Sequence, residues 1–325
     1  MEIELIENLR GRKKQIWRSF LEKFGLEADE RMDSTVFIWD GEELIATGSR
    51  QGNLLKCIAV DSSRQGEGLT GTLLTQLRQD AFANGYKHLF LYTKPGNIQL
   101  FSSLFFYPIA QTRQVLLMEN QLNGIQTFLA SLDVPCKEGK IGALVMNCNP
   151  FTFGHRHLIE TAAKECDWVY VFVLSEQQPP FPASDRLMLV KEGTRDLPNV
   201  TVHPTGPYLI SSATFPTYFL PNREQAAEIQ CLLDIAVFTK YFIPKFGITD
   251  RYVGTEPLSP MTQQYNNALR QHLSIELREI PRLESKGQPI SASTVRDLMD
   301  YAPEQLEALV PPTTLHYLAQ FRKEV

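Results

Sequence analysis

The sequence has few cysteines, and no two of them have the spacing of a metal or redox pair. The five are odd in number and none stands in a C-x-x-C arrangement: Cys57, Cys136, Cys148, Cys166 and Cys231. A disulfide framework or a zinc site is therefore not expected. We expect most of these thiols to be small buried groups in a reducing compartment.

Long hydrophobic runs and clustered positive charge are also missing. The first residues, MEIELIENLRGRKK, have no basic start followed by an apolar core, and no apolar run could cross a bilayer. We therefore expect a cytoplasmic protein without a membrane partner. The formal net charge is −5, and the basic stretch at residues 10–14 is interpreted as the start of a solvated helix. Duplex nucleic acid, which binds through clustered cations, is not an expected partner.

The length of the chain indicates two domains. Its 325 residues exceed the usual size of one domain, and a composition of 43% hydrophobic and 21% charged residues is typical of globular proteins that bury a core. Residues 119–140 combine Asn, Gly and Pro with several charges. We place the boundary there and predict domains at residues 1–130 and 131–325.

The N-terminal half has the mixed pattern of an α+β domain. Residues 12–26 place apolar side chains on one helical face, and residues 35–49 read as a hairpin about an Asp-Gly-Glu turn. A strand at 54–60 is followed by the glycine-rich residues 64–71, which open a further helix.

The C-terminal half begins with a strand–helix–strand pattern at residues 141–146, 158–166 and 168–174. That spacing predicts a βαβ unit and a parallel sheet, and hence a Rossmann-like α/β domain. In such a sheet, ligands bind beyond the carboxyl ends of the strands. The loop at residues 147–155 is therefore a candidate binding loop.

This loop carries groups suited to an anion. A helix that starts there offers free backbone N–H groups and a partial positive charge. Gly154 lets the backbone approach a phosphate closely, while His155 and Thr152 can donate hydrogen bonds to its oxygens.

A second candidate anion site is the helix start at residues 290–296. Ser291, Ser293 and Thr294 precede or open the helix, and Arg296 lies one turn inside it. Taken alone, the pattern is that of an ordinary capped helix. Together, the Thr-x-Gly-His turn and the Ser-x-Ser-Thr-x-x-Arg helix start resemble the two signature motifs of the nucleotidylyltransferase superfamily.

The resemblance implies an ATP-using enzyme in which ATP arrives as its magnesium complex. It implies that Thr152, His155 and Arg296 are catalytic, and no His, Cys or Asp cluster indicates a metal ion held by the protein itself. The further ATP or phosphate contacts that it implies come from the two motifs, from the segment at residues 181–200 and from the end of a strand near residue 253: Asn149, Phe151, Gly154, Ser291, Ser293, Thr294, Arg186, Arg195, Gly254 and Glu256. For Arg186 and Arg195, a surface helix charge is an equally good interpretation.

The glycine-rich loop of the N-terminal half is similar to motif A of the GNAT acyltransferase fold, in which backbone N–H groups grip the pyrophosphate of coenzyme A. It follows a strand and opens a helix, as that motif requires. The implied coenzyme A or pantetheine contacts are Gln65, Gly66, Gly68, Thr70 and Gly71, with Thr70 at the usual Gly or Ala position. No general base is evident, so acetyl transfer and a carrier-docking or pantetheine-binding role both remain open.

Two further segments, residues 208–220 and 253–266, resemble the citrate lyase ligases. That resemblance implies that acetate and ATP form an acetyl-adenylate, and that the acetyl group passes to the thiol prosthetic group on the acyl carrier subunit of citrate lyase. Two alternatives remain open at this point: an adenylyltransferase of the pantetheine-phosphate type, and a non-catalytic protein that senses acyl-coenzyme A.

Overall fold

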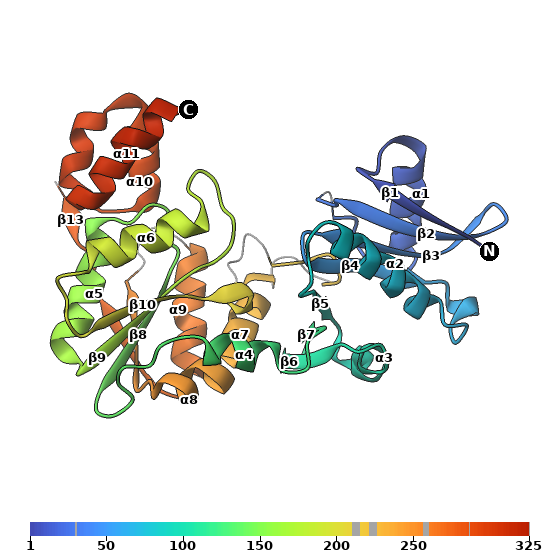
Figure 1. Cartoon of the computed structure of the whole chain (residues 1–325), viewed down its shortest axis with the longest axis horizontal. Coiled ribbons are helices and arrows are strands. Elements are labelled where there is room, and N and C mark those ends of the chain that lie inside the picture. Colours follow the sequence, from blue (N-terminus) through green and yellow to red (C-terminus); the bar gives the residue numbers. More distant parts are fainter. Residues whose placement is uncertain (30, 210–214, 221–225, 256–259, 286, 325) are drawn as a thin grey trace. The chain divides into compact units, whose positions relative to one another are not determined.

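The computed structural model describes the whole chain except residues 30, 210–214, 221–225, 256–259, 286 and 325. Contacts divide it into two units (Figure 1). Unit 1 comprises Met1–Ile125 and Pro216–Ile229, and unit 2 comprises Gln126–Phe215 and Gln230–Val325. The sequence predicts one boundary, after residue 130. The difference is that a segment from the second half of the sequence belongs to unit 1.

Aromatic burial explains this insertion. Tyr218 and Phe219 are 7% and 4% exposed. The Tyr218 hydroxyl donates to the Tyr92 carbonyl at 3.2 Å, and the Glu27 amide donates to the Tyr218 carbonyl at 2.7 Å. Each buried aromatic ring contributes about 2–3 kcal/mol of transfer free energy. The pattern of the sequence does not reveal which core such a segment will join.

Unit 1 consists of a sheet with helices on both faces. Its elements are β1 (Glu2–Glu7), α1 (Gly11–Glu22), β2 (Ser34–Asp40), β3 (Glu43–Gln51), β4 (Leu54–Val60), α2 (Leu69–Ala83), β5 (Phe90–Thr93), α3 (Ile98–Ser103), β6 (Tyr107–Gln111) and β7 (Leu116–Glu119). The predicted helix at 12–26 and hairpin at 35–49 are thus confirmed as α1 and as β2–β3. The strands β1, β6 and β7 were not predicted.

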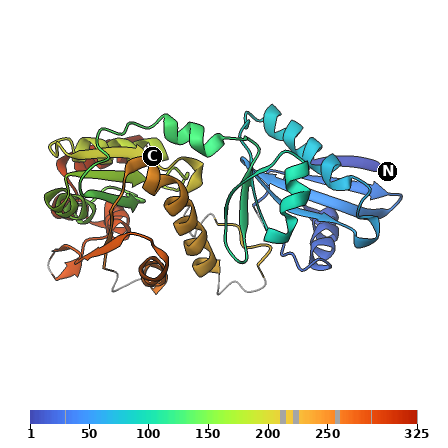
Figure 2. The same cartoon turned by 90° about the horizontal axis from the view of Figure 1, so that it is seen from below.

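The sheet of unit 1 has seven strands in the order β1-β2-β3-β4-β5-β7-β6. Helix α2 covers one face through Leu73, Leu74 and Leu77, which join a core with Val36 and Ile38. Helix α1 lies on the other face (Figure 2) and buries Trp17, Phe20 and Leu21. Alternation along the strands supplies both faces with apolar side chains.

The strands β4 and β5 run parallel and then separate. They pair only at Leu54 with Phe90 and at Leu55 with Leu91, although β4 continues to Val60. The remaining strand neighbours in this sheet are antiparallel. Two separating parallel strands followed by a glycine-rich turn and a helix form the predicted GNAT-like arrangement.

Unit 2 contains a parallel sheet and its covering helices. Its elements are α4 (Gly124–Ala130), β8 (Ile141–Met146), α5 (Phe153–Glu165), β9 (Trp168–Val173), α6 (Ala183–Gly193), β10 (Val200–Pro204), α7 (Ala226–Val237), α8 (Ile243–Phe246), β11 (Asp250–Gly254), α9 (Pro260–His272), β12 (Glu276–Ile280), β13 (Glu284–Ser285), β14 (Gln288–Pro289), α10 (Ala292–Tyr301) and α11 (Pro312–Glu324). Helices α4 and α7 each cross a boundary between the two units.

The five strands of the main sheet lie in the order β10-β9-β8-β11-β12, and every neighbouring pair is parallel. Val169 and Val171 of β9 pack toward α5 and α6, while Phe172 packs edge-on against Phe242 on the opposite face. Both faces are covered, which explains why these strands are continuous apolar runs in the sequence. The predicted α/β fold class, with a GNAT-like unit and a Rossmann-like unit, is confirmed.

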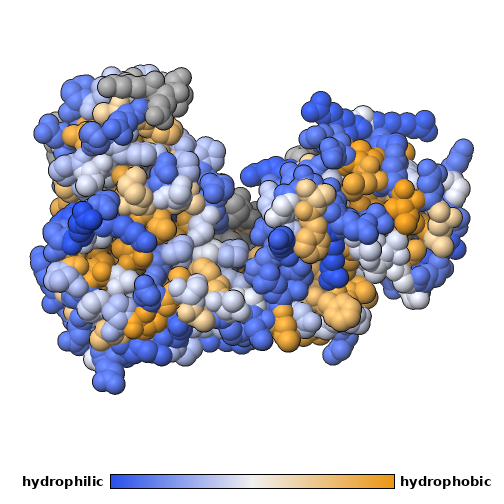
Figure 3. Space-filling model, in the orientation of Figure 1, coloured by the Kyte–Doolittle hydropathy of each residue, from blue (hydrophilic) through white to orange (hydrophobic). Residues whose placement is uncertain are grey.

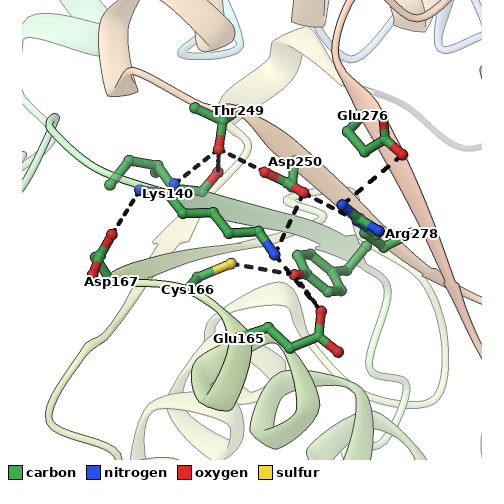
Figure 4. A network of polar contacts seen from close by, with 10 residues as sticks. Lys140, Glu165, Cys166, Asp167, Thr249, Asp250, Glu276 and Arg278 are labelled. Carbon is green, nitrogen blue, oxygen red and sulfur yellow. Dashed lines mark hydrogen bonds and ion pairs between the residues drawn. The ribbon is translucent and has the colours of Figure 1, made fainter.

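A polar network occupies the amino ends of these strands (Figure 4). Lys140 precedes β8, and its amide donates to Asp167 at 2.7 Å. Asp250, at the start of β11, accepts from Thr249 at 2.7 Å and pairs with Arg278 at 3.2 Å. These contacts join neighbouring strands at the edge opposite their carboxyl ends.

The surface of the molecule is mixed in hydropathy (Figure 3), and the cysteines are unpaired. Hydrophobic residues occur in separate groups among hydrophilic ones on the face shown in Figure 3. Within the described residues, no helix has the length and apolarity needed to span a membrane. All five cysteines are free thiols, and each is buried except Cys136.

Candidate active site

The predicted binding loop of unit 2 opens into a cavity at the carboxyl edge of the sheet. The strands β8 and β11 pair only near their starts, at Gly142 with Asp250 and at Ala143 with Arg251. Beyond those pairs lies a cavity of about 190 Å³, lined by the ends of both strands and by the first residues of α5 and α10. The strands β9 and β10 are added on one side of β8, and β11 and β12 on the other, so the order of the strands switches between β8 and β11. Such switch points are the usual ligand positions in open α/β sheets.

Thr152 and His155 form a capping box at the start of α5. The Thr152 side chain accepts from the His155 amide at 3.3 Å, and the Thr152 amide donates to His155 Nδ1 at 3.1 Å. Because Nδ1 accepts a backbone hydrogen bond, the neutral ring carries its hydrogen on Nε2. That leaves an N–H donor on a ring that lines the cavity.

The environment keeps this imidazole neutral. Burial, followed by the positive charge of Arg282, lowers the pKa of His155 to about 4. The ring also stacks on the fully buried Phe151, with ring centroids 6.1 Å apart. His155 is therefore a fixed, uncharged hydrogen-bond donor at neutral pH.

Gly154 is required by close packing of the backbone. A β-carbon at this position would lie 2.9 Å from the carbonyl oxygen of Ile290. The glycine thus brings the N-terminus of α5 against the residue that precedes the second motif.

The second motif caps α10 and reaches the same cavity. Ser291 is the N-cap, and its hydroxyl accepts from the Thr294 amide at 3.1 Å. It also contacts the Ser293 hydroxyl at 3.0 Å. Ser291 lines the cavity, whereas Ser293 and Thr294 are exposed. Two helix N-termini therefore face one cavity, an arrangement that favours bound anions.

Three other predicted residues do not line the cavity, and one contact between them joins the two motifs. The Arg296 guanidinium donates to the Asn149 carbonyl. The side-chain amide of Asn149 donates to the Pro179 carbonyl at 3.0 Å. The Phe151 ring fills the space beside Gly193, where a β-carbon would lie 2.5 Å from it. In this conformation these residues position the loop and the helix that carry the donors.

The predicted arginines of α6 and the following turn lie away from the cavity. Arg186 is fully buried and donates to the Asn147 carbonyl at 2.8 Å and to its side-chain oxygen at 2.6 Å. The Arg195 side chain is 80% exposed and pairs with Glu192 at 3.4 Å. Gly254 lines the cavity at the end of β11, and Glu256 lies outside the described residues.

The cavity has further polar lining groups that were not singled out one by one from the sequence, although Tyr265 and Asn266 belong to the segment 253–266 that resembles the citrate lyase ligases. Arg282 lines it and donates to the Thr255 carbonyl at 2.8 Å. Asn266 of α9 donates to the Gly254 carbonyl at 3.0 Å, and Tyr265 stands beside it. Arg251 lies on β11 at the base. For Arg251, the signal in the sequence is the short strand expected at residues 251–253.

Unit 1 has a larger cleft at the separated strands. A cavity of about 750 Å³ lies beside the ends of β4 and β5 and the start of α2. Every residue of the predicted coenzyme A loop lines it: Gln65, Gly66, Gly68, Thr70 and Gly71. Gly68 has a φ of +78° as the N-cap of α2, a conformation that favours glycine. Tyr218 and Phe219 line the same cleft.

Unit 2 is therefore an α/β unit with a Rossmann-like parallel sheet, in which the two predicted motifs meet at one cavity. Comparison with known proteins narrows the assignment. A family model described as "Citrate lyase ligase C-terminal domain" matches residues 141–318. The citrate (pro-3S)-lyase ligase of Klebsiella pneumoniae is 41% identical, covering 98% of this chain and 95% of the relative. The protein of the same name from Escherichia coli strain K12 is 42% identical, covering 92% and 88%.

The chain therefore belongs to the citrate lyase ligase family, and the prediction of a ligase is confirmed. Among solved structures, an acyl-CoA N-acyltransferase from Pseudomonas aeruginosa aligns with a TM-score of 0.32 and 12% identity. That alignment covers 37% of this chain and 99% of the other.

Proposed function

We propose that the chain acetylates the thiol of the prosthetic group on the acyl carrier subunit of citrate lyase and thereby activates citrate lyase. A carboxylate oxygen of acetate attacks the α-phosphorus of ATP, and the bond to pyrophosphate breaks. The thiolate sulfur then attacks the carbonyl carbon of the acetyl-adenylate, and AMP leaves. Activation splits one hard acyl transfer into two steps with better leaving groups.

The observation that carries this proposal is the cavity of unit 2, where two helix N-termini and the His155 N–H converge. Charge grows on the phosphate oxygens when the α-phosphorus is attacked. Fixed donors in a partly buried site stabilise that charge at little reorganisation cost. We assign His155 and the α5 N-terminus to the α-phosphate, and Ser291 with the α10 N-terminus to the departing pyrophosphate.

Magnesium enters this proposal as part of the nucleotide. Among the residues that the structure describes, no group of three or more His, Cys, Asp or Glu side chains could hold a metal ion. A magnesium ion on the ATP phosphates would neutralise the same oxygens that the helix N-termini face.

The cleft of unit 1 suits the long arm of the prosthetic group. Pantetheine-type groups combine a phosphate end with an extended amide chain, and the glycine-rich loop offers backbone N–H donors at one end of the cleft. We propose that Gln65, Gly66, Gly68, Thr70 and Gly71 bind that phosphate end while unit 2 forms the acetyl-adenylate.

Labelled acetate tests the proposal. The protein would be incubated with Mg-ATP, carboxyl-labelled acetate and deacetylated citrate lyase. The label is expected on the acyl carrier subunit, with one AMP formed per acetyl group and with restoration of citrate cleavage. Label transfer without ATP, or ATP consumption that yields ADP, would refute the adenylate route.

A further inference from the structure

A buried arginine that lines the unit 2 cavity has two nitrogen atoms without a hydrogen-bond partner among the described residues. Arg251 is 2% exposed, and its Nε and Nη1 atoms make no hydrogen bond to the described part of the chain. Buried donors are nearly always paired, and an uncompensated buried cation is costly. Arg251 lines the same cavity as His155 and Thr152, so a ligand in that cavity would lie beside this side chain.

The protein groups near Arg251 compensate its charge only in part. The Tyr265 hydroxyl is its hydrogen-bonding neighbour and in turn donates to Asp234 at 2.7 Å, so the Asp234 carboxylate is linked to Arg251 through that hydroxyl. Within the described residues, no carboxylate lies in ion-pair distance of Arg251. The Phe238 ring lies under the guanidinium, 4.5 Å from its central carbon. Such a contact stabilises a cation but does not satisfy its hydrogen bonds.

The neighbours of Arg251 on its own face of the sheet are small apolar side chains. Arg251 pairs in register with Ala143 of β8. Because side chains alternate along a strand, Val145 and Val253 lie on the same sheet face as Arg251, and both line the cavity. A cation flanked by two valines matches a short aliphatic acid, whose carboxylate takes the N–H groups while its alkyl end meets the valines.

We propose that Arg251 binds the carboxylate of acetate and that Val145 and Val253 limit the length of its alkyl chain. This inference rests on the proposed function of unit 2 and names the acid subsite within it. The alternative anion for Arg251 is a phosphate of ATP. The apolar flank favours the acid, since the phosphate-directed donors come from the starts of α5 and α10.

Steady-state exchange of pyrophosphate into ATP separates these possibilities. Arg251→Met is expected to raise KM for acetate by about 10- to 100-fold, the effect of losing a charge-assisted hydrogen bond, with KM for ATP changed less than about threefold. Arg251→Lys, which keeps the charge, should show an intermediate KM. Arg12→Met, at an exposed position of α1, serves as the matched control.

The outcomes have separate meanings. An unchanged KM for acetate in a folded Arg251→Met protein, or an increase confined to the KM for ATP, would overturn the assignment while leaving the proposed function intact. A wild-type protein without acetate-dependent exchange would instead refute the function itself.

Substitution of a buried arginine can prevent folding, so a second variant tests the same subsite. Val145→Ala enlarges the space beside Arg251 and should raise the ratio of propionate to acetate kcat/KM by about 10-fold, as expected for room for one more methylene group. A ratio equal to that of wild type would place the acid elsewhere.

Discussion

His155 acts through its protonation state, and its neighbours fix that state. The Thr152 amide occupies Nδ1, and burial keeps the ring neutral. The motif made His155 and Thr152 predictable because its residues are adjacent in sequence. Tyr265 lies in the segment 253–266, which the resemblance had singled out. Arg251 was not predictable, because its place depends on the register of β11 against β8.

Replacing His155 removes a donor without removing a core side chain. His155→Ala is expected to lower turnover by about 10²- to 10³-fold while the fold is retained, since loss of one charge-stabilising donor has that effect. The rate of AMP formation with saturating ATP and acetate measures this. His157→Ala, two residues along α5 and outside the cavity lining, is the control and should stay near wild type. Equal losses in the two variants would contradict the assignment of His155.

The pKa of His155 also makes stability depend on pH. The folded protein holds this pKa at about 4, against an ordinary value of 6.5. Between these values the unfolded chain binds more protons, so the free energy of unfolding falls as the pH is lowered through that window. Urea unfolding at pH 7 and pH 5 should show a larger loss for wild type than for His155→Gln. Losses of the same size would show that the ring is not kept neutral.

At the scale of elements, the two helix starts were predictable as local patterns, but their meeting was not. Capping residues and glycine define where α5 and α10 begin. Their convergence depends on contacts such as Gly154 against Ile290 and Arg296 against the Asn149 carbonyl, which join residues more than 130 positions apart. The strand β1 was missed although residues 2–5 alternate between charged and apolar side chains, and its apolar Ile3 and Leu5 are both 45% exposed.

The cap of α10 links stability to nucleotide binding. Ser291→Ala should reduce the free energy of unfolding by about 0.5–2 kcal/mol, because the Thr294 amide loses its acceptor. It should also raise KM for ATP several-fold, because this helix start lines the cavity. Denaturant unfolding and exchange kinetics measure the two effects. A variant that loses stability but keeps its KM for ATP would remove α10 from the nucleotide site.

At the scale of the whole molecule, the sequence predicted two domains with their fold types. It did not predict that a segment of the second half of the chain belongs to unit 1. Residues 216–229 follow three strands of unit 2 in sequence but belong to unit 1. Tyr218 then lines the cleft that the glycine-rich loop also lines. Such an insertion has no local signature, because buried aromatic residues suit either core.

The two cavities should respond to different ligands. Coenzyme A, as a pantetheine-containing probe, is expected to raise the melting temperature of the wild-type protein by mass action. Gly68→Val should reduce that increase, because its φ of +78° is strained for a β-branched residue. The increase with Mg-ATP should be the same in both proteins. A coenzyme A response that the substitution leaves unchanged would exclude the loop as its site.

The central claim is that unit 2 joins acetate to AMP, and isotope exchange tests it most directly. Labelled pyrophosphate would be incubated with the protein, Mg-ATP and acetate in the absence of citrate lyase. The account predicts that label enters ATP only when acetate is present, and that the exchange disappears in His155→Ala. Exchange that does not require acetate, or no exchange at any acetate concentration, would contradict a free-standing acetyl-adenylate step in this site.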